Sequence, residues 1–372
     1  MEGGGIGIEI QTISYRQIGV LLFVFMTGSS TINIPGTLIG KAGNGAWLSL
    51  LLSGFGGLCM LLMLLFLNRR FPDLSYVDYS REIIGNFLTV LFGLLSITFI
   101  LQMESAIVVD IGLFMVSSML RETPMYAFTF LIFLIAGLTA RAGIEIMARM
   151  FTLLMLLSTL SVFIVLAMGL PDYHANFLLP ILPKGFKPVI HGAVFTFGFP
   201  FVEIFLFGML LQYVNVGERK LIPKSMIIAL AASLLTLLLS TISGILVFGD
   251  YAADKPYSLF AVARIVEFQE IIQRIESIIG ISLILGSFMK ATITIYVFSM
   301  FAGRLFRLKD CSVLVMPLAL IGFLMGLVTF DSISQWGNMV TVVHPVWTAA
   351  VFSFPLLLVT LSAILRGKRQ IP

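Results

Sequence analysis

Two long apolar stretches of this chain are interrupted in their middle, and these interruptions limit what the chain can fold into. The first interruption, Thr27-Gly28-Ser29-Ser30-Thr31-Ile32-Asn33-Ile34-Pro35-Gly36, lies inside an apolar run that begins near residue 18. The second, Phe197-Gly198-Phe199-Pro200, lies inside the run from 193 to 211. A helix break frees backbone N–H and C=O groups that hydrocarbon cannot satisfy, so it persists only where protein or a watery cavity covers it. We therefore expect the two breaks to enclose a small-molecule site.

The composition indicates an integral membrane protein. Of 372 residues, 59% are hydrophobic and 11% are charged, which is too apolar for a soluble domain. The apolar runs are long enough to cross a bilayer as helices and lack the alternation of a barrel. The N-terminus lacks the pattern of a cleavable signal peptide, so we expect the first span to be retained. We predict ten spans, at 15–39, 45–67, 86–118, 124–140, 146–169, 189–213, 222–248, 272–302, 312–330 and 340–365.

The order of these spans predicts one transmembrane domain, 1–372, built from two repeats. The first repeat covers 15–169 and the second covers 189–365, with five spans in each. Because five is odd, the second repeat must enter the membrane with the opposite polarity. The broken helices are then the first and sixth, at matched depth. This geometry resembles the five-plus-five inverted repeat, or LeuT-type fold, of the amino acid, polyamine and organocation transporter superfamily.

The distribution of basic residues predicts the orientation. Lys and Arg concentrate in the loops on one side, for example at Arg69, Arg70 and Arg81. Such loops face the cytoplasm in most membrane proteins, and here they include both ends of the chain. We therefore predict that both termini are cytoplasmic.

The residue types at the breaks suit a small zwitterion or a small sugar. Unwinding frees amides at one half-helix and carbonyls at the other, which match a carboxylate and an ammonium group. Glycine allows close backbone approach, hydroxyls add hydrogen bonds, and phenylalanine rings supply apolar walls. The predicted ligand contacts at the breaks are Gly28, Ser29, Ser30, Thr31, Phe197, Gly198, Phe199 and Pro200.

Four ionisable residues lie deep within the predicted spans, where each is costly and is a functional candidate by default. They are Glu104, Asp110, Glu203 and Lys290. A buried lysine needs a carboxylate partner or loses its charge, so we expect Lys290 to pair with Glu104 or Glu203. Two roles remain open for this charge network. It either locks helices together or couples protonation to movement.

The eighth span carries a second polar face. Thr292, Tyr296 and Ser299 share one helical stripe, while Lys290 lies nearly opposite. Because hydroxyls give directional hydrogen bonds without placing a charge in the site, we predict that Thr292 and Tyr296 contact the ligand. Lys290 would then serve a network elsewhere. The alternative is that the hydroxyls bond only to neighbouring backbone.

Other classes of function lack support in the sequence. Cys59 and Cys311 do not form a disulfide framework, and His174, His191 and His344 lack metal-ligand spacing. The chain contains no phosphate loop or nucleophile triad. We therefore expect no enzyme activity, cofactor, metal or nucleic-acid partner.

Several short motifs together resemble the B subunit of endospore germinant receptors, the spore germination permeases of the same superfamily. They are Ile13-Ser14-Tyr15-Arg16-Gln17 before the first span, Thr27-Gly28-Ser29 followed by Ile34-Pro35, Arg69 with Phe71-Pro72 and Tyr79 after the second span, and Phe197-Gly198-Phe199-Pro200 with Glu203. The resemblance extends over essentially the whole chain.

The resemblance implies a nutrient sensor in the spore inner membrane. It would bind a germinant, such as L-alanine or another amino acid, and would assemble with an A subunit and a C lipoprotein subunit. The pocket would then comprise the two breaks and the stripe of Thr292 and Tyr296. Two alternatives stay open: a proton-coupled amino acid transporter, and a gated conduit for ions or water.

Overall fold

The computed structural model describes residues 11–183, 185–265, 276–330 and 332–366. The ends of the predicted domain and the predicted start of the eighth span at 272 lie outside these residues. Within them the chain is helical, apart from one isolated bridge between Ile13 and Val214.

The first half of the chain contains seven α-helices. They are α1 (Tyr15–Thr27), α2 (Ser30–Ala42), α3 (Ala46–Arg70), α4 (Tyr76–Ile84), α5 (Asn86–Phe114), α6 (Met125–Arg141) and α7 (Ile144–Met168). The second half contains α8 (Lys187–Thr196), the π-helix η5 (Phe197–Phe201), the 3-10 helix η6 (Val202–Met209), α9 (Ile222–Phe248), α10 (Ser258–Ile265), α11 (Glu276–Leu305), α12 (Val315–Thr329), α13 (Ile333–Asn338), α14 (His344–Thr348) and α15 (Phe354–Leu365).

The helices confirm an all-α membrane architecture. Among the described residues, eight helical stretches are long and apolar enough to cross a membrane. One of these stretches, Ser30–Arg70, includes both α2 and α3. The helices α1 and α6 are apolar but shorter. The ten-span count, the inverted repeat and its two boundaries stay predictions.

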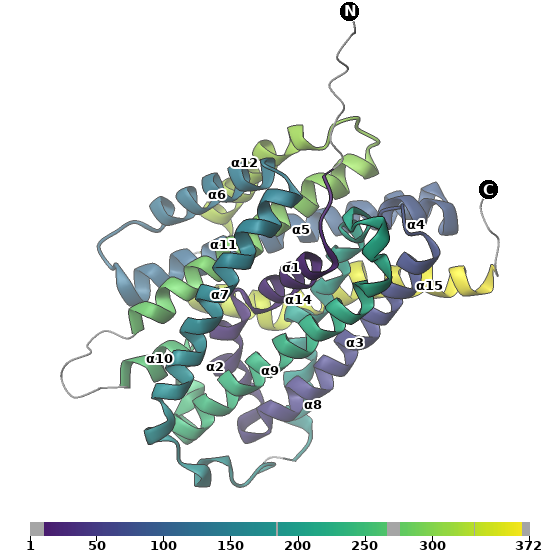
Figure 1. Ribbon diagram of the computed structural model, residues 1–372. Helices are drawn as coiled ribbons and strands as arrows, with labels where there is room; N and C mark the ends of the chain where they lie inside the picture. Colours follow the sequence, from purple (N-terminus) through teal and green to yellow (C-terminus); the bar gives the residue numbers. More distant parts are fainter. Residues whose placement is uncertain (1–10, 184, 266–275, 331, 367–372) are drawn as a thin grey trace, which may run out of the picture.

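Burial separates central helices from peripheral ones. The apolar windows of the α5 region, the α8 region and α11 are 83%, 78% and 72% buried, whereas those of α7 and α12 are 22% buried. The peripheral helices therefore carry exposed leucines such as Leu153 and Leu320, as expected of surfaces that face lipid. The short α1 and α14 lie in the middle of the bundle (Figure 1). The central helices are thus those that carry the predicted breaks and charges.

The loops rich in Lys and Arg meet at one end of the bundle. Ile13 donates its N–H to the Tyr213 carbonyl at 2.9 Å, which joins the start of the chain to the segment after η6. Arg81 donates to the Leu305 carbonyl, and Arg366 donates to the Glu82 carbonyl. This end is the one predicted to face the cytoplasm.

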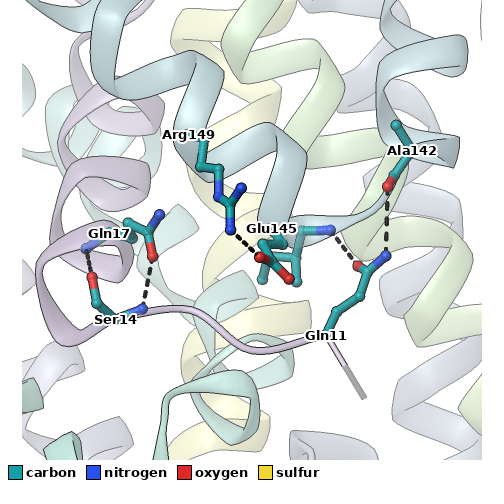
Figure 2. A network of polar contacts seen from close by, with 7 residues as sticks. Gln11, Ser14, Gln17, Ala142, Glu145 and Arg149 are labelled. Carbon is teal, nitrogen blue, oxygen red and sulfur yellow. Dashed lines mark hydrogen bonds and ion pairs between the residues drawn. The ribbon is translucent and has the colours of Figure 1, made fainter. Parts of the chain in front are cut away.

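The beginning of α1 is fixed by local side-chain hydrogen bonds. Ser14 caps the helix by accepting from the Gln17 N–H at 3.2 Å, and Gln17 Oε1 accepts from the Ser14 N–H at 2.8 Å. This capping box satisfies two N–H groups at the helix start. The Gln11 amide then bonds to the turn between α6 and α7, where its Oε1 accepts from the Ile144 N–H at 2.9 Å (Figure 2). These contacts hold α1 against its neighbours from the basic end of the bundle.

Candidate functional site

The structure contains both predicted breaks. The first separates α1 from α2 at Gly28 and Ser29, and Pro35 lies inside α2. The second lies in η5, where Phe199 has extended dihedrals (φ −140°, ψ 110°) and the Phe199–Pro200 peptide is cis. Ser29 in the first break and Gly198, Phe199 and Pro200 in the second are buried, while Gly28 is half-buried, so protein covers most of the backbone freed there.

A small cavity lies where the two breaks meet. Its walls include Ser29 from the first break, Phe199 from the second, Asp110 from α5, Glu203 from η6 and His344 from α14. Its volume is ≈ 20 Å³, room for about one water-sized group. The rest of the wall is mainly apolar, so the cavity places two acidic side chains and a histidine in apolar surroundings. A whole amino acid enters it only if the surrounding helices move apart.

Lys290 pairs with Glu203 beside this cavity. Lys290 Nζ donates to Glu203 Oε2 at 2.6 Å, and both side chains are 0% exposed. Of the two partners expected for this lysine, the structure selects Glu203. A buried pair of this kind is costly to assemble, and losing one member leaves an uncompensated charge in a dry interior.

Aromatic rings surround the ammonium group of Lys290. Its Nζ lies 5.0 Å from the centroid of the Phe25 ring and 4.3 Å from that of Phe199. The negative ring faces stabilise a desolvated cation. Phe25 comes from α1 and Phe199 from η5, so this lysine contacts the residues that flank both breaks. The expectation that Lys290 serves a network away from the breaks is wrong in this respect.

His344 belongs to the same cluster, although the spacing of histidines along the chain does not predict it. Its Nε2 lies 3.4 Å from Glu203 Oε1, and the side chain is 3% exposed. The ring packs edge-on against Phe99 and Phe199, with centroids 4.7 Å and 6.1 Å apart. Spacing along the chain gave no signal for it, because its partner lies on a helix distant in sequence.

Asp110 is tied to the first break. Asn33 Nδ2 donates to Asp110 Oδ2 at 2.5 Å and to the Ser29 carbonyl at 2.9 Å. Asp110 Oδ1 makes no hydrogen bond among the described residues, although the side chain is 1% exposed and lines the cavity. One carboxylate oxygen of Asp110 thus supports the break, and the residue also forms part of the cavity wall.

Glu104 lies apart from the other three charged residues. It is 0% exposed and makes no hydrogen bond within the described part of the chain. A Cβ placed on Gly322 of α12 would lie 2.6 Å from Glu104 Oε1, so this carboxylate packs directly on α12. The predicted network of four is therefore divided between two places.

The two glycines at the breaks are contact points between helices. A Cβ on Gly28 would lie 2.5 Å from the Gly286 carbonyl oxygen of α11, and one on Gly198 would lie 2.5 Å from Pro345 Cα. Close approach of another backbone accounts for both glycines without a ligand. Their contact with a ligand stays a prediction.

The hydroxyls at the breaks have different surroundings. Thr31 Oγ1 donates to the Thr27 carbonyl at 2.9 Å and lines a second cavity of ≈ 20 Å³ with Gly28. Ser30 Oγ is buried and makes no hydrogen bond among the described residues. Two residues of the second break pack against protein. Phe197 lies over Gly56 of α3, and Pro200 is buried within η5.

The polar stripe of α11 is not placed in either cavity at the breaks. Thr292 Oγ1 donates to the Phe288 carbonyl at 2.8 Å, which is a bond within its own helix. Tyr296 lies six residues further along α11 from Lys290, toward the end occupied by Arg304. Ligand contact by Thr292 and Tyr296 therefore stays a prediction that the cavities do not support.

Solved transporters share this fold. The Eremococcus coleocola manganese transporter, in complex with an aromatic bis-isothiourea substituted compound, superposes with a TM-score of 0.73 at 15% identity, over 98% of this chain and 85% of that one. A Na⁺-coupled sialic acid symporter in a substrate-bound outward-open state gives 0.68 at 13% identity, over 92% and 79%. These likenesses confirm the predicted LeuT-type transporter fold. At such low identity they establish the fold alone.

Sequence comparisons identify relatives that are named as spore germination proteins. Spore germination protein KB of Bacillus subtilis (strain 168) is 27% identical over 372 residues, which is 98% of each chain. Spore germination protein XB of Bacillus anthracis is 24% identical over 288 residues, covering 76% of this chain and 79% of that one. The profile of the family described as "Spore germination protein" matches residues 12–333. This permease family and the transporter fold agree with the prediction that the chain is not an enzyme. The chain is thus an integral membrane protein that belongs to the spore germination protein family.

Proposed function

We propose that this chain is the nutrient-sensing B subunit of an endospore germinant receptor. It binds a small germinant between the two broken helices and passes the change in their arrangement to an A subunit and a C lipoprotein subunit. We place it in the spore inner membrane with both termini in the cytoplasm. Membership of the family and the transporter fold support this role. A sensor needs only a pocket whose occupancy shifts a conformational equilibrium, without completed transport.

The charges around the cavity favour an amino acid as the germinant. Lys290 neutralises one carboxylate, that of Glu203, which leaves Asp110 as a second acid on the cavity wall. If both acids are ionised and His344 is neutral, one negative charge is left over in a buried site. An uncompensated buried charge is costly, so the site requires a proton or a cationic group. The ammonium group of an amino acid such as L-alanine has the size and charge for this position, whereas a neutral sugar does not.

Binding measurements on matched compounds test this proposal. Full-length protein in lipid nanodiscs would be titrated with L-alanine and L-lactate, and with glucosamine and glucose. Within each pair only the first compound carries an ammonium group. We expect the ammonium compound to bind about tenfold tighter or more, because a charge-assisted contact to a buried carboxylate is lost without it.

A variant of Asp110 tests whether this preference for an ammonium group arises in the cavity. Asp110→Asn should abolish the preference for the ammonium compound while keeping the hydrogen bond to Asn33. Asp172→Asn, outside the cavity, is the control and should keep the preference. Equal binding of both members of each pair would refute the amino acid assignment. Absence of saturable binding by every compound would refute the ligand pocket itself.

A proton-coupled amino acid transporter is the second candidate. The cluster of Lys290, Glu203 and His344 supports it, because chains of acidic and histidine side chains inside membrane proteins serve as proton relays in transporters. Counterflow uptake of labelled L-alanine into proteoliposomes separates the two. Saturable uptake that depends on a pH gradient would establish transport, and binding without uptake supports the sensor. Uptake of ions or water without saturation would instead indicate a conduit.

A further inference from the structure

A groove runs along α1, between α7 and α9. Its volume is ≈ 480 Å³, which lies within the range of about 300–1,000 Å³ that is usual for ligand sites. The helix α1 packs against both α7 and α9, and all three helices line the groove. The apolar part of the groove, called the shaft below, is lined mainly by Val20 and Phe23 from α1, Met155 and Leu156 from α7, and Ile228 from α9.

Two cations stand at one end of this apolar shaft. Arg16 in the first turn of α1 and Lys224 in the first turn of α9 both line the groove and are exposed. Arg16 Nε donates to the Tyr15 hydroxyl at 3.0 Å. The described residues that line the groove include no Asp or Glu, so its lining is positive at this end. Glu218 lies nearby, and its Oε2 accepts from the Tyr15 N–H at 2.9 Å.

The length of the groove matches one leaflet of a membrane. Its α1 lining extends from Tyr15 to Phe23, and its α9 lining extends from Lys224 to Ala232. At about 1.5 Å of rise per residue, each of these distances is about 12 Å. Half of a hydrocarbon core of about 30 Å is about 15 Å. The cations therefore stand at headgroup depth when the apolar shaft lies in one leaflet.

The charge at the end of the groove favours a phospholipid as its occupant. An acyl chain suits an apolar groove about 12 Å long, and an anionic headgroup complements Arg16 and Lys224 at its end.

We propose that this groove binds one anionic phospholipid from the leaflet at the basic end of the bundle. Its headgroup contacts Arg16 and Lys224, and one acyl chain lies along the shaft. The lipid then touches α1, the half-helix that ends at the first break. A lipid bound in the groove favours the arrangement in which α1 is held between α7 and α9. The fraction of anionic lipid in the membrane therefore influences the position of the broken helix. This site is independent of the germinant proposal.

Native mass spectrometry of the full-length protein tests the proposal. The protein would be purified in detergent and incubated with equal amounts of phosphatidylglycerol and phosphatidylcholine. Two basic contacts predict that phosphatidylglycerol is retained about tenfold or more over phosphatidylcholine. The double variant Arg16→Gln and Lys224→Gln should lose this preference. The control Lys309→Gln removes an exposed cation outside the groove and should keep it.

A second pair of variants separates the shaft from general surface charge. Ala232→Phe places a ring in the groove and should lower retention of either lipid, whereas Ala231→Phe, exposed and outside the groove, should not. The thermal midpoint of each variant shows whether it is folded. An unchanged lipid preference in the double variant, or equal retention in the two phenylalanine variants, would overturn the proposal.

Discussion

Removing the ammonium group of Lys290 should destabilise the protein strongly. Lys290→Met keeps an apolar side chain of similar length between the rings of Phe25 and Phe199. It leaves the Glu203 carboxylate, which is 0% exposed, without its partner at 2.6 Å. Breaking a buried ion pair by removing one partner costs about 3–5 kcal/mol. In a chain of this length each kcal/mol shifts the thermal midpoint by roughly 2 °C or less, so we expect a decrease of roughly 5–10 °C.

A double-mutant cycle shows whether the loss of stability comes from the unpaired buried carboxylate of Glu203. Lys290→Met combined with Glu203→Gln removes both charges and should recover most of the lost stability, because replacing a whole buried pair is often neutral. The assay is the thermal midpoint of purified protein, followed by intrinsic fluorescence in one detergent. Lys309→Met, at an exposed position, is the control and should change the free energy of unfolding by less than about 0.5 kcal/mol.

Two results would refute this account of the buried pair. One is that Lys290→Met leaves the thermal midpoint unchanged. The other is that the double variant is as unstable as the sum of the two single variants.

Three further predictions concern stability and use the same thermal assay. Glu104→Gln should raise the midpoint, since a fully buried carboxylate with no hydrogen bond among the described residues is replaced by a neutral group; a lower midpoint would mean that the charge is stabilised. Gly28→Val should lower the free energy of unfolding by about 1–3 kcal/mol, because its Cβ would lie 2.5 Å from the Gly286 carbonyl oxygen. Gly217→Val is the control and should be nearly neutral, because a Cβ there would have nothing within 4 Å. Similar effects in both variants would contradict the close contact. Ser14→Ala removes the cap of α1 and should cost about 0.5–2 kcal/mol, and an unchanged midpoint would show that the capping box contributes little.

The surface of the basic end offers a contrast to the buried pair. Arg149 and Glu145 form an ion pair one helical turn apart on α7 (Figure 2), with side chains 71% and 37% exposed. Solvent screens such pairs, which contribute about 0–1 kcal/mol. An ion pair thus affects the stability of this protein strongly in the core and weakly at the surface.

Local sequence determined the class of this protein and the position of its breaks. Membrane helices are set by continuous apolar runs, and a break is set by glycine and proline within such a run, so both can be found without knowledge of neighbours. The breaks at Gly28 and Phe199 lie within the predicted segments. The sequence predicted that Lys290 pairs with Glu104 or Glu203, and the structure shows Glu203. Burial of a lysine requires a carboxylate partner but does not specify which one.

Only the tertiary structure decided which side chains share the site. His344 joins Glu203 across two helices that are far apart in sequence, so no spacing could indicate it. Glu104 and Asp110 lie six residues apart on α5, yet one packs against α12 and the other faces the cavity. The stripe of Thr292 and Tyr296 has the pattern of a binding face, but the packing of α11 turns Lys290 toward the breaks. Hydropathy specifies that a helix is buried, whereas the rotation of each helix against its neighbours specifies which residues meet.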